Sequence, residues 1–197
     1  MSTGRLILAS ASPRRSEILN QIGVDFIVEP ANIDETSLSD ETATQFVTRM
    51  ALQKARAVCQ KRADSIPVLG ADTIVTIDSK IFGKPKNIDD AWTMLSALSG
   101  NNHQVLTSVA IDNGQKSAVL VSKTLVKFRS ISHGECLAYW QTGEPQGKAG
   151  AYAIQGYGAV FVERIEGSYS GVVGLPITET SELLKQFDVP IWLAHKF

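Results

Sequence analysis

Blocks of apolar residues along the chain predict short buried strands that alternate with amphipathic helices. The run Leu6–Leu8 is typical of a strand buried on both faces, and residues 13–22 then place their apolar side chains on one side of a helix. A second short strand is expected at residues 25–29. A long helix is expected at residues 41–63, where a threonine and a glutamine near the start have the spacing of a capping box.

The later elements follow from the same kinds of pattern. Strands are predicted at residues 67–77, 81–82, 103–112, 117–129 and 159–165, helices at residues 88–98, 132–143 and 178–187, and turns at residues 78–80 and 168–171. Asn113 and Gly114 predict a hairpin between two of the strands. Residues 144–158 are rich in glycine but too apolar for a disordered tip, so we expect an ordered loop there, and a short apolar tail at residues 190–197.

This order of elements favours an α/β fold, or a mixed α+β fold, with a twisted mixed β-sheet flanked by helices. A chain of 197 residues can bury one sizeable core. We therefore expect a single domain over residues 1–197, built as one body or as two intimate lobes.

Composition excludes a general affinity for polyanions. The chain is 44% hydrophobic and 20% charged, with a net charge of -1, so we expect neither nucleic acid nor a membrane as partner, and any basic site must be local. The start lacks the long apolar stretch of a signal peptide, and no run approaches transmembrane length. Cys59 and Cys136 have no metal-ligand spacing and are expected to be reduced core thiols. These features favour a cytoplasmic location.

Two adjacent arginines mark the start of the first helix as a candidate anion site. Ser12 is expected to accept a hydrogen bond from the first helical N–H groups, and Pro13 suits the first helical position. Arg14 and Arg15 then lie beside the positive end of the helix dipole, where a phosphate can bind. The alternative is that both arginines are simply solvated.

Asp72 and Lys54 stand out because each is a charged residue in an apolar pattern. Asp72 lies within a strongly apolar strand, where a carboxylate is costly unless it is paired, hydrogen-bonded or bound to a cation. Lys54 lies at the edge of the apolar stripe of the long helix. Two interpretations of Lys54 stay open: it has a functional role, or it is a snorkelling lysine whose stem is buried while its charge reaches solvent.

Lys84 and His103 are two further candidates. Lys84 is held between Gly83 and Pro85, which places it better to meet an anion than a lysine on an open helix face. His103 lies at the start of a strand, where a structural hydrogen bond is a more common role than catalysis.

Together these charges suit a polyphosphate with a divalent cation. The candidate set contains four cations and two acids: Arg14, Arg15, Lys54, Lys84, Glu35 and Asp72. The basic groups would neutralise phosphates, and the carboxylates would hold Mg²⁺ or Mn²⁺ or activate the attacking water. The chain has no GxxxxGK[ST] motif, and its first strand-to-helix turn has no GxGxxG, which argues against a P-loop enzyme and a dinucleotide-binding domain.

The sequence resembles the Maf family of nucleoside triphosphate pyrophosphatases along nearly its whole length. The matching motifs, in order, are SASPRRSEIL with QIGVDF, IDE, QKARAV, LGADTIV, FGKP, LSGNNHQVLTSVA, KAGAYAIQGYGA and GSYSGVVGLP. Each motif alone is weak, but their order and spacing are specific. The tail after Pro190 carries no family motif.

The resemblance implies a fold like that of the inosine triphosphate pyrophosphatases, with two lobes about a cleft. It also implies cleavage of a nucleoside triphosphate between the α and β phosphates, with a divalent metal cation, Mg²⁺ or Mn²⁺. The residues implied as catalytic are Asp72, Lys54, Lys84 and Glu35, of which Glu35 and Asp72 would hold the metal; those implied to bind substrate are Ser10, Arg14, Arg15, Thr73 and Gln155. Asp72 falls on the position described as the proton acceptor, although a role as metal ligand stays open.

Three positions resemble the branch of the family that acts on dTTP and UTP. These are Arg14 after Ser-Pro, Thr73 after the catalytic aspartate, and Gln155 in the glycine-rich loop. A glutamine amide can both donate to and accept from the O4 and N3–H edge of uracil or thymine. The branch acting on 7-methyl-GTP has an acid in place of the glutamine, which suits a positively charged methylated base.

Two alternatives stay open beside hydrolysis of dTTP and UTP. One is a pyrophosphatase for 7-methyl-GTP or another modified nucleotide. The other is a nucleotide-binding regulator of septum formation and cell division, which would bind nucleotide without meaningful hydrolysis. The resemblance suggests a house-cleaning role in nucleotide metabolism, and a homodimer is a further expectation.

Overall fold

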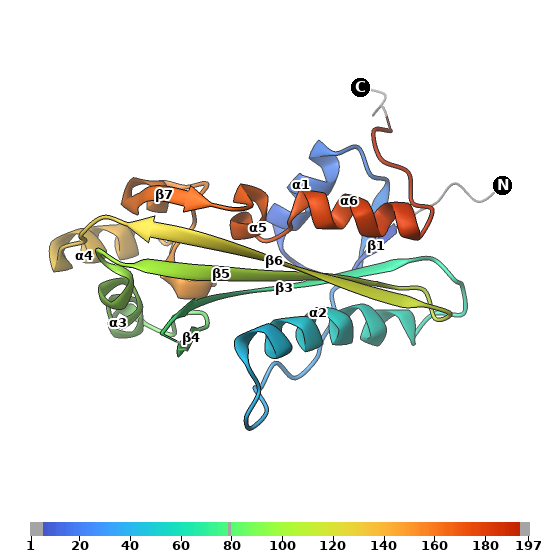
Figure 1. The fold of residues 1–197 in the computed structure, drawn as a ribbon, viewed down its shortest axis with the longest axis horizontal. Helices are drawn as coiled ribbons and strands as arrows, with labels where there is room; N and C mark the ends of the chain where they lie inside the picture. The colour runs from blue at the N-terminus through green and yellow to red at the C-terminus, as the bar shows by residue number, and fades with distance from the viewer. Residues whose placement is uncertain (1–5, 79, 194–197) are drawn as a thin grey trace. The chain divides into compact units, whose positions relative to one another are not determined.

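The computed structural model describes residues 6–78 and 80–193, and the fold over these residues is a mixed α/β arrangement (Figure 1). Its strands are β1 (Leu6–Leu8), β2 (Phe26–Val28), β3 (Val68–Ile77), β4 (Lys80–Phe82), β5 (Asn102–Asp112), β6 (Ser117–Phe128) and β7 (Val162–Glu166). Its helices are α1 (Pro13–Gln21), α2 (Ala43–Cys59), α3 (Ile88–Leu98), α4 (His133–Gln141), α5 (Tyr169–Val173) and α6 (Ile177–Gln186), with short 3-10 helices at Ala149–Ala151 and Tyr157–Phe161.

The described strands form one seven-stranded sheet of mixed direction. The strand order is β2-β1-β3-β5-β6-β7, with β4 paired to β3 beside this path. β1 pairs in parallel with both β2 and β3, whereas β4 is antiparallel to β3 and β7 is antiparallel to β6. The predicted fold class is therefore confirmed, and so is the hairpin, since β5 and β6 are neighbours joined by residues 113–116.

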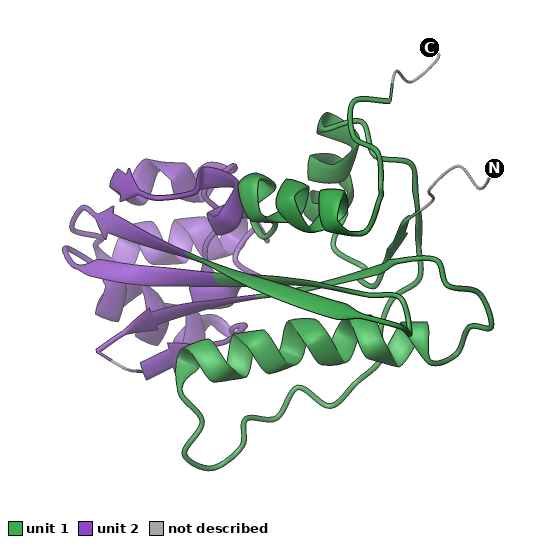
Figure 2. Ribbon diagram, turned by 45° about the vertical axis from the view of Figure 1, so that its right-hand side comes forward, with its two compact units in different colours: residues 1–72, 107–122, 174–197 green, residues 73–106, 123–173 purple. Residues whose placement is uncertain are grey.

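The chain divides into two compact units (Figure 2). Unit 1 comprises residues 1–72, 107–122 and 174–197, and unit 2 comprises residues 73–106 and 123–173. Within the described part of the chain, no helix is long and apolar enough to cross a bilayer.

Unit 1 is layered, with helices on both faces of its strands. α2 covers one face, and α1 and α6 lie on the other (Figures 1 and 2). A buried cluster joins β1 and β3 to α2 and contains Ile7, Ala9, Ala55, Val58, Cys59 and Val68. The apolar stripe predicted for the long helix is thus the face that α2 buries against the sheet.

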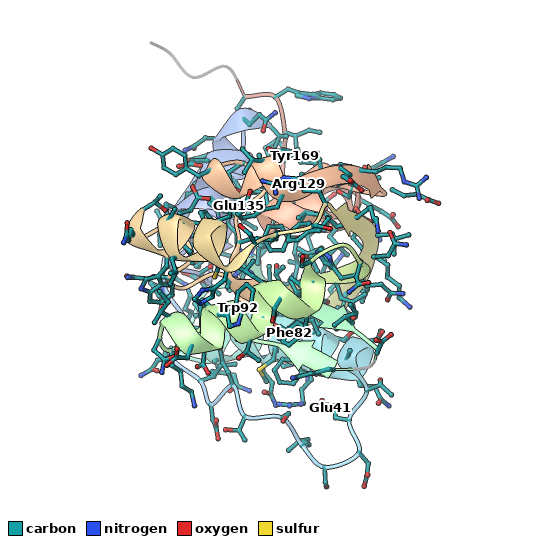
Figure 3. The ribbon with its side chains drawn as sticks, turned by 90° about the vertical axis from the view of Figure 1, so that its left-hand side faces the viewer. Glu41, Phe82, Trp92, Arg129, Glu135 and Tyr169 are labelled. Atoms are coloured by element: carbon teal, nitrogen blue, oxygen red, sulfur yellow. The ribbon has the colours of Figure 1, made fainter. Side chains whose placement is uncertain are left out.

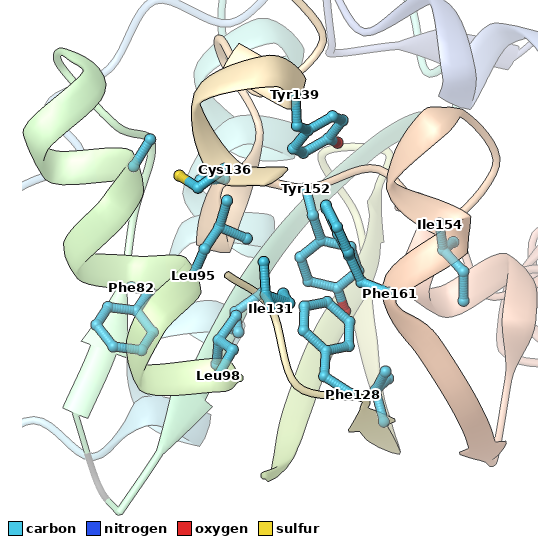
Figure 4. Close-up of a cluster of buried hydrophobic side chains, with 14 of the residues drawn as sticks. Phe82, Leu95, Leu98, Phe128, Ile131, Cys136, Tyr139, Tyr152, Ile154 and Phe161 are labelled. Atoms are coloured by element: carbon cyan, nitrogen blue, oxygen red, sulfur yellow. The ribbon is translucent and has the colours of Figure 1, made fainter. Parts of the chain in front are cut away.

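Unit 2 is built around a larger aromatic core (Figure 4). α3 packs beside α4, and fully buried Phe128 makes ring contacts with Tyr152 and Phe161 at centroid separations of 4.7 and 6.1 Å. Cys136 is a free buried thiol in this core, as Cys59 is in unit 1, so both cysteine predictions hold. The predicted ordered loop at 144–158 contributes Tyr152 and Ile154 to the core.

Several local predictions were wrong or only partly right. Residues 169–173 form α5 rather than a turn, and the predicted strand at 159–165 begins as a 3-10 helix and becomes extended only at Val162. The long helix ends at Cys59, short of residue 63. In the tail, the Trp192 N–H donates to the carbonyl of Ile22, while residues 194–197, like Ser79 in the turn predicted at 78–80, lie outside the described residues.

Candidate active site

The centre of the candidate site is a buried lysine that joins two carboxylates in unit 1. Lys54 Nζ lies 2.7 Å from Asp72 Oδ1 on β3 and 2.7 Å from Glu35 Oε1 in the segment before α2. The side chains of Lys54 and Asp72 are only 10% and 11% exposed, whereas that of Glu35 is 48% exposed. Lys54 is therefore not a snorkelling lysine: its charge is turned inward, where it pairs with the buried acid.

A glycine brings the helix and the strand of this pair together. Gly70 lies on β3, and a Cβ there would overlap the carbonyl oxygen of Ala51 and lie 2.6 Å from the N atom of Ala55, both on α2. The two main chains can approach this closely only because residue 70 has no side chain. The contact is two residues before Asp72 and within one turn of Lys54, so it sets the separation between the two charged groups.

Burial and charge act in opposite directions on Asp72. Burial raises the pKa of Asp72 above its usual value, while the ammonium of Lys54, and more weakly the guanidinium of Arg15, work to lower it. The outcome is a carboxylate that is more basic than one in water and is held by a cation. Such a group suits a general base at neutral pH.

Arg15 belongs to the same network. Its Nη1 donates to Ser10 Oγ at 2.9 Å, and its Nε donates to the carbonyl oxygen of Gly174 at 2.9 Å. Burial lowers the pKa of Arg15, and Asp72 and then Glu35 counteract this. The alternative of a simply solvated arginine is wrong for Arg15. Its charge is held at the start of α1 within electrostatic reach of both acids.

The serine hydroxyl with hydrogen bonds at this turn is that of Ser10, and not that of Ser12 as was expected. The Ser12 side chain makes no capping hydrogen bond, although Ser12 is the N-cap residue of α1 and Pro13 follows it as predicted. Instead the Ser12 N–H donates to Ser10 Oγ at 3.2 Å. The hydroxyl of Ser10 thus bonds both the turn and Arg15, which corrects the prediction for Ser12. Arg14 is half-buried, and burial lowers its pKa.

An arginine on α2 anchors the segment that carries Glu35. Arg49 donates to both carboxylate oxygens of Glu41, at 2.7 and 2.6 Å, and to the carbonyl oxygen of Thr36 at 3.2 Å. Thr36 is also bonded to Asp34, through its N–H at 2.9 Å and its hydroxyl at 2.6 Å. Glu35 is thus flanked by residues that are fixed to α2, the helix that carries Lys54.

The remaining predicted site residues belong to unit 2. Lys84 is exposed between β4 and α3, Thr73 follows Asp72 on β3, and Gln155 is exposed in the loop between the two 3-10 helices. Their roles stay predictions. His103 is buried, with Nε2 2.9 Å from the hydroxyl of Tyr152, and burial lowers its pKa to about 4. These contacts indicate a neutral, structural histidine.

The acids of unit 1 are of the chemical type that a divalent cation takes as ligands. Asp72 and Glu35 supply hard carboxylate oxygens close to one another, since each has one oxygen 2.7 Å from the ammonium of Lys54. Mg²⁺ commonly takes one or two carboxylates from the protein and the rest of its ligands from phosphate and water. The partly exposed Glu35 and the buried Asp72 would hold it.

Sequence reasoning missed Arg49 and Glu41, which position Glu35. They are eight residues apart, and Glu41 precedes the helix, so no helical periodicity connects them. It also missed Glu144 and Tyr139, which hold the loop of Gln155 and are described below. Their main partners are backbone N–H groups, which leave no mark in the residue pattern.

Comparison with known proteins agrees with this fold. The family model "Maf-like protein" matches residues 5–187. Proteins named dTTP/UTP pyrophosphatase from Hahella chejuensis and Pseudoalteromonas atlantica are each 50% identical, over 95% and 97% of this chain and 94% and 99% of their own length. The solved structure of the Staphylococcus aureus Ham1 protein matches with a TM-score of 0.52 at 13% identity, covering 93% of this chain and 97% of that one, which supports the fold alone. This chain belongs to the Maf family.

Proposed function

We propose that this protein is a nucleoside triphosphate pyrophosphatase that hydrolyses dTTP and UTP to the monophosphate and pyrophosphate. The observation that carries the proposal is the network of Lys54, Asp72, Glu35 and Arg15 in unit 1. Relatives named dTTP/UTP pyrophosphatase, 46–50% identical over nearly the whole chain, support the choice of substrate.

In this proposal Asp72 removes a proton from the attacking water. The water oxygen forms a bond to the α-phosphorus, the bond between that phosphorus and the bridging oxygen of the β-phosphate breaks, and pyrophosphate leaves with the electron pair. Burial gives Asp72 the raised pKa that a general base needs. Lys54 holds the ionised form in position, 2.7 Å from Oδ1.

The basic groups stabilise the charge that develops on the phosphates. Arg15 and Arg14 begin α1, where the helix dipole adds to their own charge, and Ser10 fixes the direction of the Arg15 guanidinium. Lys84 is proposed to serve the same purpose. Mg²⁺ or Mn²⁺, held through Glu35, would supply a further positive charge on the phosphate oxygens. In the alternative assignment, Asp72 is a second ligand of the metal and is not the base.

Gln155 is proposed to recognise the base, and Thr73 is proposed to contribute to substrate binding. The exposed amide of Gln155 offers a donor and an acceptor, the pair that complements O4 and N3–H of uracil or thymine. In this proposal Gln155 contacts the base of the nucleotide and not its triphosphate. It therefore changes preference among triphosphates rather than the chemistry of cleavage.

The test is pyrophosphate release, with Mg²⁺ or Mn²⁺, from dTTP, UTP, CTP, 7-methyl-GTP and ITP. We expect preference for dTTP and UTP. Preference for 7-methyl-GTP would keep the reaction and refute the substrate. Tight nucleotide binding without release from any of the five would support the regulatory alternative. Location in the cytoplasm and a homodimer stay predictions, to be tested by cell fractionation and by light scattering.

A further inference from the structure

A single carboxylate in unit 2 organises the loop that carries Gln155. Glu144 Oε1 accepts hydrogen bonds from the Tyr139 hydroxyl at 2.7 Å and from the Gly158 N–H at 2.8 Å. Its Oε2 accepts one from the Tyr157 N–H at 2.9 Å. The carboxylate therefore binds the chain immediately after Gln155 at two successive backbone groups.

Tyr139 extends this anchorage to the other side of the same loop. Its hydroxyl donates to Glu144 and accepts from the Ala153 N–H at 3.1 Å. Its ring packs edge-on against Phe161, with centroids 5.1 Å apart, in the aromatic core (Figure 4). Both ends of the segment 153–158 are thus attached to one hydrogen-bonded pair, and that pair is fixed in the core of unit 2.

Two glycines leave the space that this pair occupies. A Cβ on Gly156 would overlap Oε2 of Glu144, and a Cβ on Gly158 would lie 2.6 Å from the hydroxyl oxygen of Tyr139. The loop therefore closes directly around the two polar groups. Burial opposes ionisation of Glu144, but the hydrogen bonds from Gly158, Tyr139 and Tyr157 outweigh it and hold its pKa below the usual value. The carboxylate is thus ionised and saturated with donors at neutral pH.

We propose that Glu144, together with Tyr139, is a positioning residue for Gln155 and thereby sets the selectivity of the enzyme for uracil and thymine. The inference rests on the function proposed above. A glutamine amide rotated by half a turn presents its donor and acceptor in reverse order, the pattern that suits cytosine. The amide alone cannot separate UTP from CTP. Selectivity therefore depends on where and in which direction the side chain is presented to the base, and a fixed main chain at residue 155 is the first condition for this.

The experiment is a double-mutant cycle of Glu144→Gln and Gln155→Ala, read as the ratio of kcat/KM for UTP to that for CTP. Glu144→Gln keeps the size of the side chain but replaces one accepting oxygen with an NH₂ donor. The backbone N–H that this oxygen bonded is left without an acceptor. We expect that ratio to fall about fivefold to tenfold in this variant. In the Gln155→Ala background we expect no further fall, because the residue that Glu144 positions is gone.

Glu135→Gln is the matched control. Glu135 is a carboxylate on α4 that accepts hydrogen bonds from Ser132 and forms an ion pair of 2.7 Å with Arg129 (Figure 3), and glutamine also completes a capping box. Glu135→Gln therefore makes the same carboxylate-to-amide change in the same unit, at a residue that has no bond to the loop of Gln155. We expect its UTP to CTP ratio to equal that of the wild type.

The other outcomes are distinguishable. If Gln155→Ala lowers the ratio and Glu144→Gln does not, the inference is wrong and the proposed function stands. If Glu144→Gln lowers the UTP to CTP ratio equally with and without Gln155→Ala, Glu144 has a general structural role, and the inference is also wrong. An unchanged ratio in Gln155→Ala would refute the proposed role of Gln155 itself. Should Glu144→Gln fail to fold, Tyr139→Phe removes only a hydroxyl and is expected to lower the ratio in the same way.

Discussion

The two units use opposite kinds of interaction to fix their candidate residues. In unit 1, charges hold one another: Lys54 joins Asp72 and Glu35, and Arg49 binds Glu41. In unit 2, a single carboxylate is surrounded by neutral donors, which are a phenol and backbone N–H groups. Ion pairs suit a site for a triphosphate, which all nucleotides share. Directional hydrogen bonds suit the choice among bases, so damage to each unit is expected to have a different kinetic signature.

The largest effect is expected from Asp72→Asn. The amide cannot accept the proton of water, so kcat should fall by about a hundredfold to ten-thousandfold. The loss should be equal for dTTP, UTP and CTP, because the residue acts on the phosphate and not on the base. Circular dichroism would check that the fold is intact. Normal turnover in this variant would refute the assignment of Asp72.

A smaller loss is expected from Arg49→Ala. Without the guanidinium, the segment that carries Glu35 is no longer fastened to α2, and kcat should fall by about tenfold to a hundredfold, with base preference unchanged. Arg62→Ala is the matched control, since Arg62 binds Glu29 and Asp64 at 2.9 and 2.6 Å in the same unit. Equal losses in the two variants would show that Arg49 has no special role.

Gln155→Glu should change preference and leave the chemistry intact. A carboxylate cannot donate to O4 of uracil, so we expect selectivity for dTTP and UTP over 7-methyl-GTP to fall by about tenfold. Cleavage of the triphosphate itself should persist. Steady-state kinetics on the same panel of nucleotides measures both quantities. Unchanged selectivity would count against the account of Gln155.

The smallest effect is expected on the free energy of unfolding, and it tests whether buried His103 in unit 2 is neutral. The pKa of buried His103 is lowered to about 4, below the usual 6.5, so the unfolded chain binds a proton that the folded chain does not. Stability from this residue is therefore present above pH 6.5 and is lost as the pH falls towards 4. At pH 5.5 the loss should be about 1 kcal/mol. Urea titrations at pH 7 and 5.5 should show a weaker pH dependence for His103→Gln than for the wild type.

The sequence predicts elements and charged candidates well where a pattern repeats locally. The strand that contains Asp72, the capping box of α2 and Pro13 at the first position of α1 were all confirmed. α5 was missed because Tyr169–Val173 contains β-branched valines and a glycine, which disfavour a helix. It forms because Ser168 accepts the Gly171 N–H at 3.0 Å through its hydroxyl.

Pairings between distant residues could not be predicted in this way. In the sequence, Lys54 has the spacing of a residue at the edge of the apolar stripe of α2. Only the fold, in which α2 approaches β3 closely at Gly70, shows that its side chain turns inward to Asp72. Glu144 could not be recognised at all from local pattern, since nothing in the sequence of a loop shows which acid its backbone N–H groups will face.

The contact at Gly70 has a consequence for anyone who wishes to redesign the protein. Because main-chain atoms of α2 and β3 meet there, the separation of the two backbones that carry Lys54 and Asp72 is set by backbone contact and not by a side chain at residue 70. A library that varies the exposed positions around Gln155 can therefore explore new bases while the cleavage machinery keeps its dimensions. Position 70 itself must stay glycine, since a single added methyl group would separate the helix from the strand.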